Sequence, residues 1–212
     1  TGQSMRYPVK DVLPDKASQI EYISMVNWGE GNLLQTGDKR ITEFGYCVSE
    51  DFLKMFSFTL IQGDQQHALD EPTSIVITES TAKSLFGDVD PLGQVIRIDN
   101  HRDQKVTGVI ADFPKQSQFE FDYLLPFAFY EATNSWVSRA KTSWDNNSFQ
   151  MFVQLREGAT EAETNTAIRD VIKDNNPKSP TAKLFLHPMS KWRLHANFEE
   201  GVNTGGRIDH VR

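Results

Sequence analysis

The histidines are the first candidates for chemistry, because imidazole binds metals and transfers protons near neutral pH. The chain has five of them, at His67, His101, His187, His195 and His210. No two are spaced i, i+4 and no HExxH sequence occurs, so the helical zinc-binding pattern is missing. His67 and His101 lie in polar segments and His187 follows an apolar run, which favours surface or capping roles. We therefore expect no metal site.

One stretch offers a serine nucleophile. Residues 80–83 read Ser-Thr-Ala-Lys, which matches the SxxK pattern of class A β-lactamases and penicillin-binding proteins. The SDN and KTG sequences that accompany SxxK in those enzymes are missing, so the match is formal. Cys47 is the single cysteine and stands in an apolar, strand-like run, where a thiol behaves as a small hydrophobe. We expect neither Ser80 nor Cys47 to be catalytic.

Acidic residues occur in adjacent pairs, namely Glu50/Asp51, Asp70/Glu71 and Glu199/Glu200. Neighbouring side chains on a helix or strand point apart, so these pairs do not provide the facing carboxylates of a glycosidase. No GxxxxGK[ST] sequence occurs, so we expect no nucleotide site and no other cofactor. The net charge is −7 and the pI is about 5.2, which disfavours nucleic acid and anionic lipid as partners.

An aromatic-rich region lies in the middle of the chain and comprises Phe119, Phe121, Tyr123, Phe127, Phe129, Tyr130 and Trp136. Such a group can line a ligand groove, but aromatic residues pack more often in a core. We favour the core and keep the groove as the alternative.

The elements that position these residues begin with a short helix and three strands. A short helix is predicted within residues 8–18, with a kink or an end at Pro14. Strands are predicted at 20–28, 33–35 and 41–48, and glycine-containing turns separate them. Three consecutive strands with tight turns are typical of an antiparallel meander.

The segment from Ser74 to Pro114 carries the clearest local signals. Residues 74–77 form a short apolar strand, and Thr78 is placed to cap a helix that Gly87 ends. Residues 95–98 and 105–110 are predicted to form a hairpin. This segment is a predicted β-α-β-β unit without catalytic residues.

The last third is predicted to contain one irregular helix within 127–144 and then a β-α-β unit. That unit comprises a strand at 150–155, a helix at 160–174 and a strand at 184–186. Strand-rich and helical segments in this order predict an α+β fold. No apolar run approaches the roughly 18 residues of a membrane span.

The order of these motifs resembles a known family. The sequences Ser-Ile-Val-Ile-Thr at 74–78 and Ala-Lys-Ser-Leu-Phe-Gly at 82–87 are followed by Asp-Pro-Leu-Gly at 90–93. Val-Thr-Gly-Val at 106–109 and Asp-Phe-Pro at 112–114 complete the series. This series is similar to that of MacB-like periplasmic core domains, especially in the Bacteroidetes type of FtsX-like permease.

The resemblance runs from about residue 8 to residue 195 and implies a fold with two lobes. A discontinuous porter-like lobe, with an antiparallel sheet and helices, would comprise residues 1–70 and 148–195. A sabre-like β-α-β-β lobe would be inserted at 71–147. Residues 196–212 would form a flexible lead to a missing transmembrane helix.

The resemblance also implies a function. The chain would be the periplasmic domain of an ABC transporter permease, on the outer side of the bacterial inner membrane. There it would couple cytoplasmic ATP hydrolysis to substrate export or to mechanical signalling. Its partners would be a second permease protomer, a cytoplasmic ATPase and other envelope components or an exported substrate. It would have no catalytic, cofactor-binding or metal-binding residue.

Two alternatives stay open from the sequence, namely a stand-alone envelope binding or adaptor module and a hydrolase that uses either Ser80 or a histidine–carboxylate site. Both ends of the chain lack a closing element, so we expect membrane helices to flank it in the parent protein. Apolar runs of roughly 20 residues before Thr1 and after Arg212 would support the permease, and a signal peptide or stop codon there would favour the adaptor.

Overall fold

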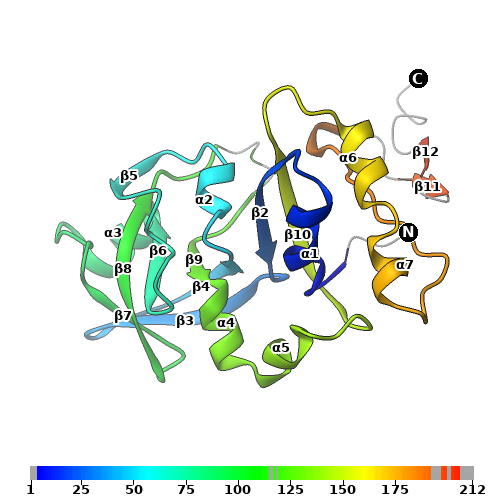
Figure 1. Cartoon of the computed structure of the whole chain (residues 1–212). Coiled ribbons are helices and arrows are strands. Elements are labelled where there is room, and N and C mark those ends of the chain that lie inside the picture. The colour runs from blue at the N-terminus through cyan, green and yellow to red at the C-terminus, as the bar shows by residue number, and fades with distance from the viewer. Residues whose placement is uncertain (1–3, 115–116, 118, 192–196, 200–201, 206–212) are drawn as a thin grey trace. The chain divides into compact units, whose positions relative to one another are not determined.

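The computed structural model describes residues 4–114, 117, 119–191, 197–199 and 202–205 (Figure 1). Its chain divides into two compact units. Unit 1 contains Thr1–Glu21, Ala140–Ser148 and Val153–Arg212, and unit 2 contains Tyr22–Arg139 and Phe149–Phe152. Both units mix helices and strands, so the fold is α+β.

Unit 2 is built around six strands whose pairing closes on itself. Their order is β4-β3-β7-β8-β6-β9, and β9 pairs with β4 again. These strands are β3 (Glu30–Thr36), β4 (Lys39–Val48), β6 (Ser74–Thr78), β7 (Val95–Ile98), β8 (Arg102–Ile110) and β9 (Tyr123–Pro126). The β4–β9 and β6–β8 pairs are parallel and the other four are antiparallel. A further strand, β5 (Leu60–Gly63), pairs with β8.

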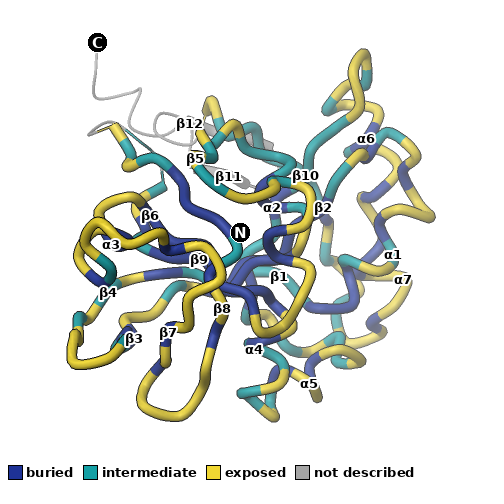
Figure 2. Tube along the Cα trace, turned by 90° about the vertical axis from the view of Figure 1, so that its left-hand side faces the viewer, coloured by how far each residue is buried: buried dark blue, intermediate teal, exposed yellow. Residues whose placement is uncertain are grey.

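The core of unit 2 lies between these strands. All five residues of β6 are buried, as expected for a strand with neighbours on both sides and apolar contacts on both faces. Ile75, Ile96 and Ile110 are completely inaccessible to solvent. Figure 2 shows buried positions along β6 and β9 and exposed positions at the hairpin turns.

The first strands do not form the predicted meander. β3 and β4 form a hairpin, but β2 (Ile20–Val26) pairs with β4, at Val26 and Val48, rather than with β3. The other edge of β3 pairs with β7. The prediction was wrong because strand order was inferred from adjacency in the sequence, whereas in the structure β4 lies between β2 and β3.

The helix after β6 forms as predicted. In α3 (Glu79–Phe86), the hydroxyl of Thr78 accepts a hydrogen bond from the N–H of Thr81 at 3.3 Å. Gly87 ends the helix with φ of +66°, a value that glycine adopts without a steric penalty, and its N–H donates to the carbonyl of Lys83. A four-residue helix, α2 (Phe52–Met55), precedes β5.

The aromatic-rich region forms two helices, α4 (Phe127–Thr133) and α5 (Ser135–Ala140), where one irregular helix was predicted. Asn134 separates them in an extended conformation. The ring of Phe149 is completely buried and lies 5.7 Å from Phe127 and 5.6 Å from Trp136, between ring centroids. This part of the aromatic group is therefore core, as we favoured.

Unit 1 gathers segments from both ends of the chain. They are β1 (Met5–Arg6), α1 (Val9–Lys16), α6 (Glu161–Ile168), α7 (Val171–Asn175), a 3-10 turn (Met189–Lys191), and parts of β2 and of β10 (Asn147–Leu155). Val9, Leu13 and Ile168 are at most 1% exposed and form its core. Pro14 lies inside α1, which continues for two residues beyond it.

The predicted helix at 160–174 is divided into α6 and α7. Between the two helices, the carbonyl of Arg169 accepts a hydrogen bond from the N–H of Leu184 at 2.9 Å. The predicted strand at 184–186 is absent from the described residues. This segment instead hydrogen-bonds to α6 and its end, since the N–H of Leu186 donates to the side chain of Asn165 at 2.6 Å.

The boundaries of the two units differ from those of the predicted lobes. Residues 140–147, which were assigned to the sabre-like lobe, belong to unit 1, and residues 149–152, which were assigned to the porter-like lobe, belong to unit 2. Residues 22–70, which were assigned to the porter-like lobe, belong to unit 2, because β3 and β4 pair with β7 and β9. In the predicted flexible run 196–212, residues 197–199 and 202–205 form the antiparallel strands β11 and β12, and the remaining residues lie outside the described ones. No helix within the described residues is long and apolar enough to cross a membrane.

Candidate functional site

The SxxK residues occupy the first turns of α3. Both the N–H and the hydroxyl of Ser80 donate to the carboxylate of Asp112, at 3.0 and 2.5 Å. Lys83 lies on the exposed side of the helix. The serine proton is thus directed to a carboxylate in a contact that fastens the start of α3 to the segment after β8. This contact gives the serine a structural role.

The described histidines do not converge. The Nδ1 of His67 lies 2.7 Å from a carboxylate oxygen of Asp70, and this hydrogen bond raises the pKa of His67. His101 is exposed in the β7–β8 turn. His187 is half-buried in unit 1, and His195 and His210 lie outside the described residues. Within the part of the chain that the structure describes, no three His, Cys, Asp or Glu side chains could hold a metal ion together.

Cys47 lies in β4 and is 1% exposed. Burial, and next the negative charge of Glu30, raise the pKa of its thiol well above the usual range. A thiol of this kind is neutral and shielded, so it is a poor nucleophile. It acts as a core residue, in agreement with the sequence prediction.

The adjacent carboxylates have separate partners. Asp51 accepts a hydrogen bond from the ammonium group of Lys54 at 3.0 Å, and Asp70 accepts one from His67. Nothing is described for the side chains of Glu199 and Glu200. A different carboxylate pair comes together across β4 and the start of β9, where burial and next the neighbouring Asp122 raise the pKa of Glu43.

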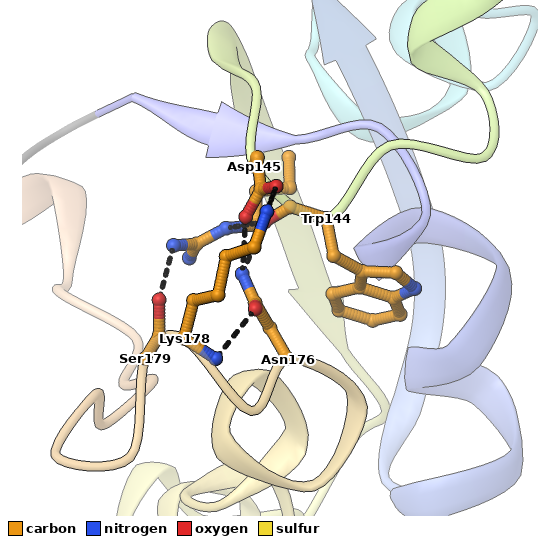
Figure 3. A network of polar contacts seen from close by, with 6 residues as sticks. Trp144, Asp145, Asn176, Lys178 and Ser179 are labelled. Carbon is orange, nitrogen blue, oxygen red and sulfur yellow. Dashed lines mark hydrogen bonds and ion pairs between the residues drawn. The ribbon is translucent and has the colours of Figure 1, made fainter.

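Unit 1 contains the most developed polar network (Figure 3). Asn176 is 4% exposed, and its side-chain amide donates to the carbonyl of Trp144 at 2.9 Å and to Asp145 at 3.0 Å. Its side-chain oxygen accepts a hydrogen bond from the N–H of Lys178 at 3.0 Å, and the ammonium group of Lys178 lies 2.6 Å from Asp145. The hydrogen-bonding groups of this buried amide are thereby satisfied.

Arg6 extends the network to the N-terminal strand. Its guanidinium group donates to the carbonyl of Trp144 and, at 3.2 Å, to the hydroxyl of Ser179. The network therefore joins β1, the residues before β10 and the turn after α7, three segments that are distant in the sequence. It is a structural joint, and none of its members was singled out from the sequence, because its hydrogen bonds depend on how distant segments meet.

Unit 2 contains a hollow with mixed lining. Its volume is about 300 Å³, and it is lined by Glu50, Leu69, Asp70, Pro126, Phe127 and Ala128. We call it the acidic hollow. Glu50 and Asp70 were interpreted from the sequence as parts of separate surface pairs. Leu69 is adjacent to Asp70, but Pro126, Phe127 and Ala128 lie far from both acidic residues in the sequence, so no sequence spacing could have revealed this arrangement.

The other large feature of unit 2 is an aromatic cluster. It comprises Phe52, Phe56, Phe58, Phe113, Phe119, Phe121 and Phe152, whose neighbouring rings lie 4.6 to 6.4 Å apart between centroids. At the centre of the cluster, Phe52 is inaccessible to solvent, and Phe121 is 4% exposed. Phe56, Phe58 and Phe119 are half-buried. Edge-to-face contacts dominate, which is typical of a packed aromatic core.

Solved structures of similar fold come from transporter proteins. A domain of a putative permease protein from Porphyromonas gingivalis has a TM-score of 0.70 and 21% identity, covering 88% of this chain and 86% of that one. The periplasmic region of MacB from Actinobacillus actinomycetemcomitans has a TM-score of 0.61 and 19% identity, covering 82% and 75%. The extracellular domain of the noncanonic ABC-type transporter YknZ from Gram-positive bacteria has a TM-score of 0.60 and 14% identity, covering 88% and 91%. At these identities the likeness establishes the fold.

No curated protein sequence matches the chain. The family itself is established by sequence. The MacB-like periplasmic core domain family matches residues 2–171, which is most of the 212-residue chain. The fold, with its interrupted unit 1, agrees with that match, and the chain is a member of the MacB-like periplasmic core domain family.

Proposed function

We propose that this chain is the periplasmic domain of an ABC transporter permease and transmits mechanical work from a cytoplasmic ATPase to the outer side of the inner membrane. The family assignment supports the setting. The observation that carries the mechanical role is the course of the chain, which passes between unit 1 and unit 2 four times. A part that transmits force needs this kind of multiple covalent connection.

The physical argument is one of stiffness. A single linker lets two domains move independently, because few contacts cross between them. Here residues of β2 and β10 belong to both units, so the chain passes from one unit to the other within regular strands. The Asn176 network holds unit 1 together across its separated segments. Motion applied to the ends of unit 1 is therefore passed into unit 2.

In this proposal unit 1 is the porter-like lobe and unit 2 is the inserted sabre-like lobe. The partners are a second permease protomer and a cytoplasmic ATPase, and the load is an exported substrate or another envelope component. This role requires no catalytic residue, metal or cofactor of the chain itself. Its contribution is to change position as the ATPase changes state.

The test measures distances in the whole permease, reconstituted with its ATPase in lipid nanodiscs. A spin label is attached through Asp15→Cys, an exposed position in α1 of unit 1, and a second sample carries it through Asp88→Cys in unit 2. The buried Cys47 is not expected to react with the label in the folded protein. Distances between the two protomers are then recorded with ADP alone and after addition of ATP and vanadate, which traps the ATPase with ADP and vanadate bound.

We expect the distance distribution to shift between the two nucleotide states at both labels. An ATPase variant unable to bind ATP serves as the control and should abolish the shift. Identical distributions in both states at both positions would refute mechanical coupling. A shift in unit 1 without one in unit 2 would refute the transmission of motion between the units.

A further inference from the structure

The closed set of strands in unit 2 consists of two three-stranded sheets that meet at two short seams. In one sheet, β4 pairs with β3 at seven residues and with β9 at four. In the other, β8 pairs with β6 at five residues and with β7 at four. Between the sheets, β3 pairs with β7 at only two residues, and β6 pairs with β9 at only two. Fewer backbone hydrogen bonds therefore cross the seams than hold either sheet together.

One of these sheets is a continuous piece of chain. β6, α3, β7 and β8 follow one another from Ser74 to Ile110, whereas β3 and β4 precede this segment and β9 follows it. We call residues 74–110 the flap; β5, whose partner is β8, moves with it. Every residue of β6 and β9 is buried, while β7 alternates between exposed and buried positions. The β3–β7 seam is thus the one that water reaches, and the buried β6–β9 seam is the hinge.

Asp99 bridges the β3–β7 seam. It lies in the turn between β7 and β8, where its N–H donates to the carbonyl of Leu33 in β3 at 2.9 Å. The N–H of Leu33 donates in return to Oδ1 of Asp99, also at 2.9 Å. In the orientation that satisfies both of its ends, the amide of Asn32 donates to Oδ2 of Asp99 at 3.1 Å and accepts from the hydroxyl of Tyr123 at 2.9 Å. One carboxylate thus ties the flap to β3 and, through Asn32, to β9.

Separation of this seam would uncover the apolar interior. Ile96 and Ile98 of β7 are 0% and 2% exposed, and Leu34 of β3, which pairs with Ile98, is 0% exposed. Their burial favours the closed state, so the open state is a minor population in equilibrium with it. Any change that weakens the contacts across the seam raises that population.

We infer that the flap opens at the β3–β7 seam and turns on the β6–β9 seam, with the carboxylate of Asp99 as its latch. In the open state β7 has left β3, and the hydrogen bonds within the β3–β4 hairpin and within the flap stay formed. All the parts of this device belong to unit 2, so the inference does not rest on the proposed transport role.

The first test is amide hydrogen exchange, followed by NMR on the isotope-labelled 212-residue chain at a pH where closing is faster than exchange. We expect the amides of Gln35 and Arg97, which are paired across the seam, to have a larger opening constant than the amides that pair β3 with β4. Asp99→Ala removes the latch and should raise the opening constant of Gln35 and Arg97 about 10- to 100-fold, as for lost hydrogen bonds to a charged acceptor. The constants within the β3–β4 hairpin should stay unchanged.

Two variants of the same turn region serve as controls. Asp103 is an exposed carboxylate like Asp99, but it holds Arg97 within the hairpin, at 2.7 and 3.0 Å. Asp103→Ala should therefore change the opening constant less than about threefold, as for an exposed ion pair. Asn100 has φ of +64°, so Asn100→Gly relieves the backbone of the turn and keeps the carboxylate of Asp99. That variant should not raise the opening constant.

A buried thiol distinguishes a moving flap from a frayed turn. Ile96→Cys introduces a thiol on the inner face of β7, away from the turn, and the buried Cys47 of β4 is the internal reference. Labelling by iodoacetamide is followed by peptide mass spectrometry, which separates the two positions. We expect position 96 to be labelled through the same opening as the Gln35 amide, and Asp99→Ala to accelerate it by the same factor. Cys47 should be labelled only through global unfolding.

Three results would overturn the inference. The first is exchange of Gln35 and Arg97 with the same opening constant as the β3–β4 hairpin. The second is an effect of Asp99→Ala no larger than that of Asp103→Ala, or one that extends equally to the β3–β4 hairpin. The third is labelling of position 96 only together with Cys47, which would reduce the opening to fraying of the turn.

Discussion

Replacing Asn176 by alanine tests whether the polar network in unit 1 holds its separated segments together. The substitution removes three hydrogen bonds, two donated by the side-chain amide and one accepted by its oxygen. The backbone of Asn176 is extended and its N–H donates to Ile172, and alanine can keep both features. The change is therefore confined to the side-chain contacts.

The expected loss in free energy of unfolding depends on which hydrogen bonds the partners of Asn176 retain. A buried hydrogen bond contributes roughly 0.5–1.5 kcal/mol net, so three together contribute about 1.5–4.5 kcal/mol. The carbonyl of Trp144 still accepts from Arg6, Asp145 still contacts the lysine side chain, and the N–H of the exposed Lys178 can bind water. We therefore expect a loss of about 2 kcal/mol, which lowers the Tm of a domain of this size by roughly 4–8 °C.

The assay combines urea denaturation followed by circular dichroism with hydrogen exchange measured by mass spectrometry. Asn175→Ala is the matched control, because Asn175 is exposed and makes one hydrogen bond within its own helix, to Val171 at 2.8 Å. We expect that control to cost less than about 0.5 kcal/mol. Exchange should increase in peptides that cover residues 4–17, 140–148 and 176–184.

Two results would refute the reasoning. If Asn176→Ala costs no more than Asn175→Ala, the network is effectively hydrated and does not stabilise unit 1. If the added exchange appears in residues 74–110 of unit 2 instead, the network does not act locally in unit 1.

Three further predictions concern unit 2. A methyl group added by Gly45→Ala would clash with the carbonyl of Tyr123 and lie 2.5 Å from its ring, so we expect the β4–β9 pairing to be lost. The free energy of unfolding, measured by urea denaturation, should fall by about 3 kcal/mol or more, and a fall below about 1 kcal/mol would contradict this prediction. Burial and next Asp122 raise the pKa of Glu43 in the folded state, so its contribution to stability is complete below the unfolded pKa and is lost as the pH rises through the folded pKa. Glu43→Gln should remove this loss, and equal pH slopes for both proteins would show that the pair is unimportant. Cys47 should react with iodoacetamide only in urea, and mass spectrometry that detects alkylation of the folded chain would disprove its burial.

The sequence predicts most of the local structure of unit 2. The strand at β6, the helix α3 and the β7–β8 hairpin follow from signals within a few residues, such as the cap at Thr78 and the glycine at position 87. These signals act over the span of one turn or one hairpin, so the rest of the chain does not alter them. The order of such motifs also gave the family.

Strand partners and sites could not be predicted in the same way. β4 pairs with β9 although about 75 residues separate Val48 from Tyr123, and nothing local in either strand specifies the other. The acidic hollow brings together residues near positions 50, 70 and 127 for the same reason. The prediction of a closing strand at 184–186 was wrong, because three consecutive apolar residues have the same sequence pattern whether they join a sheet or pack beside helices.

The interrupted course of unit 1 also sets an order of events during synthesis. The hydrogen bonds of Arg6 can form only after Trp144 and Ser179 have been synthesised, which are 138 and 173 residues later in the chain. Nearly all of unit 2 has left the ribosome by then. Contacts of such long range form slowly, so the first helix emerges early with its apolar face unpaired. A nascent chain that has emerged from the ribosome as far as about residue 140 would hold an almost complete unit 2 beside an unfolded N-terminal segment, whose apolar side chains would be open to binding by a chaperone.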